Sequence, residues 1–204
     1  MPTLEIEARL RCAGYTCVAG IDEAGRGPLA GPVLAAAVIL PVDFAHAVLN
    51  DSKQLSAKRR EKIYEELMAD DRLLIGSAAA SVEEVDRLNI LRASHLAMER
   101  AVRGLPRLPD ICIIDGLPVP RFPWPHEGIV KGDGLSLSIA AASIIAKVER
   151  DRIMLAADVE YPQYGFAAHK GYGTPLHLAR LRKYGPCPLH RRSFQPVAQL
   201  SLDF

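Results

Sequence analysis

Short apolar runs recur along the chain, each bounded by glycine, proline or charged residues, and they predict the strands of one sheet. The runs cover residues 15–21, 32–40, 73–80 and 109–114. Apolar runs of this length are typical of buried strands. The sequence therefore predicts a central sheet.

Helical spacing of apolar residues fills the intervals between these runs. Ser56 can cap a helix that runs to about Met68. A capping box, Ser81-Val82-Glu83-Glu84, precedes apolar side chains at helical spacing: Val85, Leu88, Leu91, His95 and Met98. Residues 138 to about 157 predict another helix, whose alanines allow a close approach to a neighbour. We expect these helices to pack against the sheet, which gives an α/β fold.

The segment 117–128 has a different pattern, because proline recurs in it. Proline removes a backbone donor and fixes φ, so this segment cannot form the interior of a helix. We expect a loop or an edge hairpin, in which Trp124 packs locally.

The composition is that of an ordinary globular protein, with 204 residues, 49% of them hydrophobic and 24% charged. This length favours a single domain over residues 1–204. The longest apolar stretch, 31–41, is too short to cross a bilayer, and the acidic N-terminal segment lacks the regions of a signal peptide. We therefore expect a cytoplasmic protein without a membrane partner, and a monomer, since nothing calls for a dimer.

The four cysteines show no C-x-x-C spacing, so we expect neither a zinc site nor a disulfide. The net charge is +1, but from residue 161 onward Asp203 is the only acid among six lysines and arginines. Such a segment can hold a polyanion or can be a solvated basic helix, and both interpretations stay open. No pair of the histidines in it, His169, His177 and His190, has the helical spacing of a metal site, so we expect them at the surface or against phosphate.

The run Asp22-Glu23-Ala24-Gly25-Arg26-Gly27-Pro28 follows the first apolar stretch directly. Adjacent carboxylates repel and raise each other's pKa unless a cation neutralises them, and hard divalent cations take oxygen ligands. Gly25 and Gly27 let the backbone approach a ligand, and Arg26 can reach a phosphate. The alternative is a solvated turn after a strand.

Two further acids stand at the ends of predicted elements. Asp115 follows the apolar run 111–114, and Asp133 lies just ahead of the alanine-rich helix. Alone, each would be an ordinary turn or cap residue. With Asp22 and Glu23 they make four carboxylates, enough to hold two metal ions about 3.5–4 Å apart in a phosphodiesterase site.

These motifs resemble those of the bacterial ribonuclease HII family, the type 2 ribonucleases H. The matching blocks occur in the family's order and span nearly the whole chain. They are Val18 to Pro28; Asn50-Asp51-Ser52-Lys53; Ile113-Ile114-Asp115-Gly116; Lys131-Gly132-Asp133 with Ala141-Ala142-Ser143-Ile144; and Tyr164-Gly165-Phe166 through His169-Lys170-Gly171-Tyr172. Arg191, Arg192 and Ser193 echo a further family block, without a clear role.

The resemblance implies a ribonuclease H-like fold, a central mixed sheet flanked by helices, with a basic helical C-terminal extension over about 174–204. It also implies a metal-dependent endoribonuclease that acts on RNA/DNA hybrids. Such an enzyme nicks 5′ of single ribonucleotides embedded in duplex DNA and leaves 3′-hydroxyl and 5′-phosphate ends. Its expected duty is the removal of misincorporated ribonucleotides from DNA.

Carried over by residue, the resemblance makes Asp22, Glu23, Asp115 and Asp133 the catalytic and metal-binding acids. They would hold Mg²⁺ or Mn²⁺, one ion activating water and the other stabilising the leaving 3′ oxygen. Asp151 competes for the place of the fourth acid, but the family pattern favours Asp133.

The resemblance also assigns the residues that bind substrate. Gly25, Arg26 and Gly27 would recognise the 2′-hydroxyl, which distinguishes RNA from DNA. Tyr172 would pack on the sugar after the ribonucleotide; the alternative is a half-buried core tyrosine. Ser52 and Lys53 would contact backbone phosphates.

Three other functions deserve comparison. Gly25-x-Gly27-x-x-Ala30, with Asp51 further on, formally fits a dinucleotide-binding fingerprint, but that motif opens a helix, and prolines intervene here. A non-catalytic nucleic-acid binder has no use for four acids beside a polyanion. A processive type 1 ribonuclease H remains the nearest alternative, since acid clusters alone do not set substrate choice.

Overall fold

A five-stranded mixed sheet forms the centre of the protein, with the strand order β3-β2-β1-β4-β5. The computed structural model describes residues 1–46, 49 and 55–200. The strands are β1 (Val18–Ala24), β2 (Val33–Ile39), β3 (Leu74–Ala80), β4 (Ile111–Asp115) and β5 (His126–Ile129). The pairs β1–β2 and β2–β3 are antiparallel, whereas β1–β4 and β4–β5 are parallel. All four predicted strands are therefore present, and the expected mixed sheet is confirmed.

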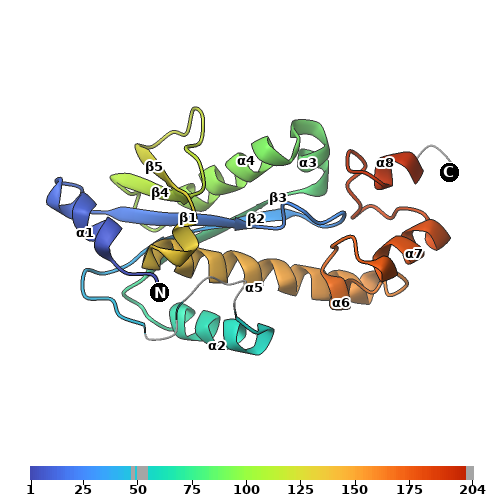
Figure 1. Ribbon diagram of the computed structural model, residues 1–204, viewed down its shortest axis with the longest axis horizontal. Coiled ribbons are helices and arrows are strands. Elements are labelled where there is room, and N and C mark those ends of the chain that lie inside the picture. The colour runs from blue at the N-terminus through green and yellow to red at the C-terminus, as the bar shows by residue number, and fades with distance from the viewer. Residues whose placement is uncertain (47–48, 50–54, 201–204) are drawn as a thin grey trace.

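Helices cover both faces of this sheet (Figure 1). They are α1 (Glu5–Cys12), α2 (Ala57–Met68), α3 (Val82–Leu88), α4 (Ile90–Arg103), α5 (Leu137–Glu160), α6 (Phe166–His169), α7 (Pro175–Tyr184) and α8 (Val197–Leu200). Helices α3 and α4 lie on one face, and α2 and α5 lie on the other. The short helices α6, α7 and α8 lie beyond one end of the sheet, next to the end of α5.

Alternation along the strands explains the two layers. In β2, Ala35 and Ala37 pack with the α4 side of the core, and Leu34 and Ala36 pack with the α5 side. Helix α5 approaches β1 closely at Gly20, where an added Cβ would lie 2.3 Å from the backbone carbon of Ser138. Small residues at this crossing thus bring the start of α5 against the central strand.

The predicted helix starts are confirmed at two capping residues. The Ser56 side chain accepts from Arg59 N at the start of α2, and Ser81 and Glu84 form a reciprocal capping box at α3. The long helix begins one residue earlier than predicted, because the Ser136 side chain caps it.

Three elements differ from the prediction. Strand β1 continues to Ala24, because Asp22 and Glu23 pair with Ala36 and Ala35 of β2, so these acids lie within a strand and not after it. The periodic run behind Ser81 is two helices, since Asn89 has a φ of 67° and caps α4. Residues 126–129 form an edge strand parallel to β4, not a hairpin.

Trp124 packs against the core next to Phe122, as expected, and all four cysteines are free, as also expected. The surface role expected for three histidines is wrong, because His169, His177 and His190 are buried together. The rings of His169 and His177 stack at 4.3 Å, and His177 Nε2 lies 3.1 Å from His190 Nε2. Aromatic neighbours such as Phe166 enclose them, which a charge count along the sequence could not reveal.

Candidate functional site

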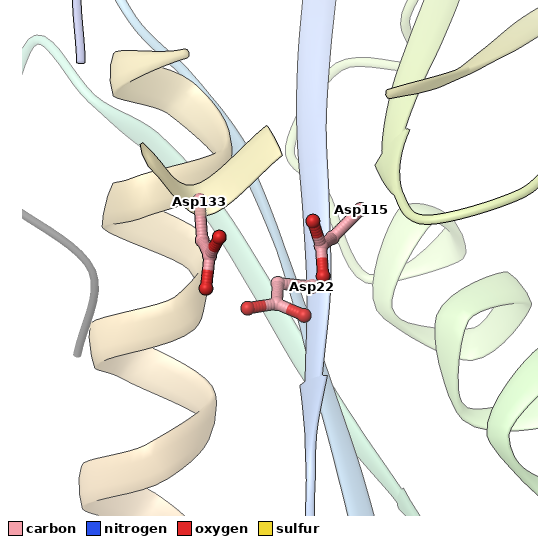
Figure 2. Close-up of side chains that lie close together, drawn as sticks. All are labelled: Asp22, Asp115 and Asp133. Carbon is pink, nitrogen blue, oxygen red and sulfur yellow. The ribbon is translucent and has the colours of Figure 1, made fainter. Parts of the chain in front are cut away.

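Three carboxylates converge where β1, β4 and the start of α5 meet (Figure 2). Oxygen atoms of Asp22, Asp115 and Asp133 all lie within 4.8 Å of one another. Asp22 and Asp133 are buried and Asp115 is half-buried. Asp115 lies 93 positions after Asp22, and Asp133 lies 18 positions after Asp115. The fold therefore brings together three of the four acids predicted from the sequence.

The sheet register places the first two acids. Ile21 pairs with Ile114 in parallel strands, so the next residues, Asp22 and Asp115, lie side by side. The backbone N–H of Gly132 donates to Asp115 Oδ1 at 2.7 Å, which ties this carboxylate to the turn that carries Asp133. That short 3₁₀ turn, Gly132–Gly134, leads directly into α5.

The electrostatics of Asp22 indicate a cation site. Burial raises the pKa of Asp22 well above its usual value, and the neighbouring Glu23 and Asp115 carboxylates raise it further. Hydrogen bonds from Ser143 and from the backbone N–H of Glu23, at 2.7 Å, oppose this shift. A divalent cation would relieve the repulsion, and oxygen-only ligands suit a hard ion such as Mg²⁺ or Mn²⁺.

Glu23 lies beside this group and not in it. Its Oε1 accepts from Arg26 Nη1 at 3.0 Å, and burial still raises the pKa of Glu23 despite this ion pair. Glu23 and Arg26 both line two cavities of the site.

The first cavity joins the acids to the predicted substrate residues. It has a volume of about 320 Å³, and its lining includes Asp22, Asp115, Tyr172 and the turn from Gly25 to Gly27. The Tyr172 side chain is 44% exposed, which is unlike a core tyrosine. Ser52 and Lys53 lie outside the described residues.

Sequence reasoning missed two residues of this cavity, Ser143 and Lys147. They project from α5 with Asp151, whose Oδ1 accepts from Lys147 Nζ at 2.7 Å. Asp151, the competing fourth acid, is thus paired with a lysine and lies outside the acid cluster. The spacing of four between 143, 147 and 151 on one predicted helix was the available signal.

A second cavity, of about 390 Å³, shares Glu23, Arg26 and Asp115 with the first. Leu91, His95 and Met98 of α4 line it together with the loop after β4. This cavity could not be predicted, because those α4 residues repeat in the sequence like an ordinary core face.

The dinucleotide-binding alternative is excluded by the local fold. The chain after Gly27 enters strand β2, where a dinucleotide fingerprint requires a helix. Across the described ranges, no helix combines the length and apolar character that a bilayer crossing requires.

Comparison with known proteins gives a family and close relatives. The family model for Ribonuclease HII matches residues 19–197. The Ribonuclease HII of Geotalea daltonii is 50% identical over 199 residues, an alignment that covers 97% of this chain and 92% of that protein.

Solved structures give the same fold. The ribonuclease H2 of Pyrococcus horikoshii superposes with a TM-score of 0.77 at 24% identity, covering 92% of this chain and 98% of that one. Bst-RNase HIII, in a structure described as a complex with Mn²⁺, has a TM-score of 0.68 at 18% identity and covers 92% of this chain and 70% of that one. The expected ribonuclease H-like fold is confirmed.

Proposed function

The chain belongs to the ribonuclease HII family of endoribonucleases, and we propose that it hydrolyses RNA in RNA/DNA hybrids and nicks duplex DNA 5′ of a single embedded ribonucleotide. Cleavage on that side leaves 3′-hydroxyl and 5′-phosphate ends. The observation that carries the proposal is the cavity in which Asp22, Glu23 and Asp115 meet the Gly25–Gly27 turn and Tyr172.

Asp22, Asp115 and Asp133 are the residues that would hold a metal ion, with Glu23, the neighbour of Asp22, as a further ligand. When bound, divalent ions activate water and stabilise the leaving oxygen in phosphodiester hydrolysis. The three acids come from two paired strands and from the 3₁₀ turn ahead of α5. We assign catalytic roles to these three because they lie together, and to Glu23 because it lines the same cavity.

The turn and Tyr172 supply the discrimination between RNA and DNA in this proposal. Gly25 has a φ of 96°, a backbone conformation that other residues adopt with strain, so the turn can present peptide groups to a 2′-hydroxyl. Tyr172 lines the same cavity, and Lys147 Nζ lies 5.8 Å from the centre of its ring. An exposed aromatic ring beside a cation suits a sugar and its phosphate.

Phosphate contacts by Ser52 and Lys53 would add affinity without sequence preference. We further propose that the protein acts as a single-domain cytoplasmic monomer that removes misincorporated ribonucleotides from DNA. The one central sheet supports the single domain.

The test is cleavage of a DNA duplex that contains one ribonucleotide, with Mg²⁺ or Mn²⁺ and with EDTA as the metal-free control. An all-DNA duplex and a long RNA/DNA hybrid run beside it, and product ends are mapped on a denaturing gel. A metal-dependent nick 5′ of the ribonucleotide is the expected result. Cleavage of the long hybrid alone would indicate a type 1-like activity, and cleavage of neither substrate would indicate a binding protein.

A further inference from the structure

Arg191 is fully buried and holds the loop that carries the Gly25–Gly27 turn. Its guanidinium donates to four backbone carbonyl oxygens of this loop. Nη2 donates to Gly25 O at 2.6 Å, Nη1 to Arg26 O at 3.0 Å and Pro28 O at 2.8 Å, and Nε to Gly31 O at 2.9 Å. One side chain, distant in sequence, therefore fixes the path of the whole loop.

Burial of the charged Arg191 guanidinium costs free energy, so its hydrogen bonds to the loop have to offset that cost. A buried charge is ordinarily paired with an opposite charge. Among the described residues no carboxylate lies within ion-pair distance of Arg191, and burial lowers its pKa to about 9. Only arginine offers five donors in a rigid fork, so a lysine here would leave some of these carbonyl oxygens without a donor.

A second buried arginine links the same loop to the segment that carries Tyr172. Arg150 donates to Ala30 O at 3.1 Å and Pro32 O at 3.0 Å, and also to Lys170 O at 3.1 Å. The backbone adds a direct bond, from Leu29 N to Gly171 O at 2.8 Å.

The turn also packs directly on this second guanidinium. A Cβ added at Gly25 would lie 2.0 Å from Arg150 Nε, so the turn has no room to shift toward α5. Arg191 thus donates to a carbonyl oxygen of the turn, and Arg150 packs against Gly25 of the same turn.

We propose that Arg191 and Arg150 are positioning residues that set the spacing between the Gly25–Gly27 turn and Tyr172, and thereby the preference for a ribonucleotide followed by DNA. This inference rests on the proposed function. A junction substrate is read at two points, the 2′-hydroxyl by the turn and the next sugar by Tyr172. Cleavage there depends on both points at once, whereas a long hybrid presents a 2′-hydroxyl in every register.

The test uses Arg191→Lys and Arg150→Lys. Each variant keeps the positive charge but lacks the planar guanidinium and its several N–H donors. Arg192→Lys is the matched control: Arg192 is the exposed neighbour of Arg191, and its backbone N–H donates to Asp86, whereas its side chain forms no hydrogen bond with any residue that the structure describes. For each protein, kcat and KM are measured on the single-ribonucleotide duplex and on a long hybrid, below the melting temperature found by thermal denaturation.

We expect each buried-arginine variant to lose about 10- to 100-fold in kcat on the single-ribonucleotide duplex, as a displacement of about 1 Å would cause. The loss on the long hybrid should be at least several-fold smaller, and Arg192→Lys should match the wild type on both. If the arginines were merely structural, their substitution would lower the folded fraction and reduce both activities equally. An unchanged ratio of kcat on the single-ribonucleotide duplex to kcat on the long hybrid therefore overturns the inference. If Arg191→Lys does not fold, Arg150→Lys decides in the same way. Failure of the wild type to cleave the single-ribonucleotide duplex refutes the proposed function instead.

Discussion

Replacing Asp22 by Asn should stabilise the metal-free protein while it abolishes cleavage. Asp22 is only 4% exposed, and its carboxylate lies within 4.8 Å of the oxygens of two other acids. Without a cation, the folded state has to keep these negative charges together, whereas the unfolded chain separates them. Asn has almost the same shape but no charge.

The magnitude follows from the geometry. Two unit charges 4.8 Å apart repel by about 3.5 kcal/mol at an effective dielectric constant of about 20. Asp22 faces Asp115 in this way, and the Asp115 carboxylate is one of the groups that raise its pKa. Against this, the charged hydrogen bonds from Glu23 N–H and Ser143 are weakened, at about 1 kcal/mol each. A net gain of about 1.5 kcal/mol remains, which corresponds to about 4 °C in melting temperature for a protein of this size.

Thermal denaturation in EDTA and in excess Mg²⁺ or Mn²⁺ measures this effect. Asp71→Asn, the same change at an exposed position, is the control. In EDTA the Asp22→Asn protein should melt higher than the wild type. Excess metal should stabilise the wild type, by about 2.7 kcal/mol at 100 times the dissociation constant, and should hardly change the variant. A variant that melts lower than the wild type in EDTA, or that gains as much from metal, would refute the reasoning.

Three further predictions concern cleavage and pH. Asp115→Asn should abolish cleavage and leave binding of the single-ribonucleotide duplex unchanged or tighter, because a negative charge facing phosphate is removed; metal-dependent turnover by the purified variant in the gel assay would contradict its role. Tyr172→Ala should slow cleavage at a single ribonucleotide by more than it slows cleavage of a long hybrid, and equal losses in kcat/KM would rule out junction sensing. Burial lowers the pKa of both His177 and His190 to about 4, against about 6.5 in the unfolded chain. Below pH 6.5 the unfolded chain therefore binds more protons than the folded protein does. The free energy of unfolding should fall as the pH falls toward 4. At pH 5 the loss should be about 2 kcal/mol per histidine. Denaturation midpoints at pH 7 and 5 test this in the Asp22→Asn protein, because ionisation of Asp22 acts in the opposite direction; equal midpoints would show that the two histidines are not held neutral.

The strands and most helix starts could be predicted because their determinants are local. An apolar run between breakers or a serine three residues before its bonded N–H is visible in a short window. The end of β1 could not be predicted in this way, since Asp22 and Glu23 have low strand propensity and are held in the strand by pairing with β2. The break at Asn89 was hidden for a similar reason, because apolar periodicity continues through a residue that changes the helix direction.

Some residues of the candidate site could be predicted from the sequence and others could not. Its acids were predictable as a group, because each alone is an ordinary turn or cap residue but four carboxylates together imply a cation. The three that meet do so through strand register and one short turn. Arg191 and the buried histidines were not predictable, since a charged or polar residue in a basic segment suggests a surface. Arg150 was not predictable either, because it stands among the charged residues Lys147, Glu149 and Asp151 of the predicted helix.

The reason lies in the partners of these buried groups. Arg191 is satisfied by carbonyl oxygens about 160 residues earlier in the chain, and every residue has a carbonyl oxygen, so no side-chain pattern marks the acceptors. An acid cluster can be recognised from its own residue types, whereas an arginine that binds backbone has no such mark in the sequence. Gly25 shows this for Arg150: an added Cβ would lie 2.0 Å from Arg150 Nε, yet in the sequence the glycine by itself indicates only a turn.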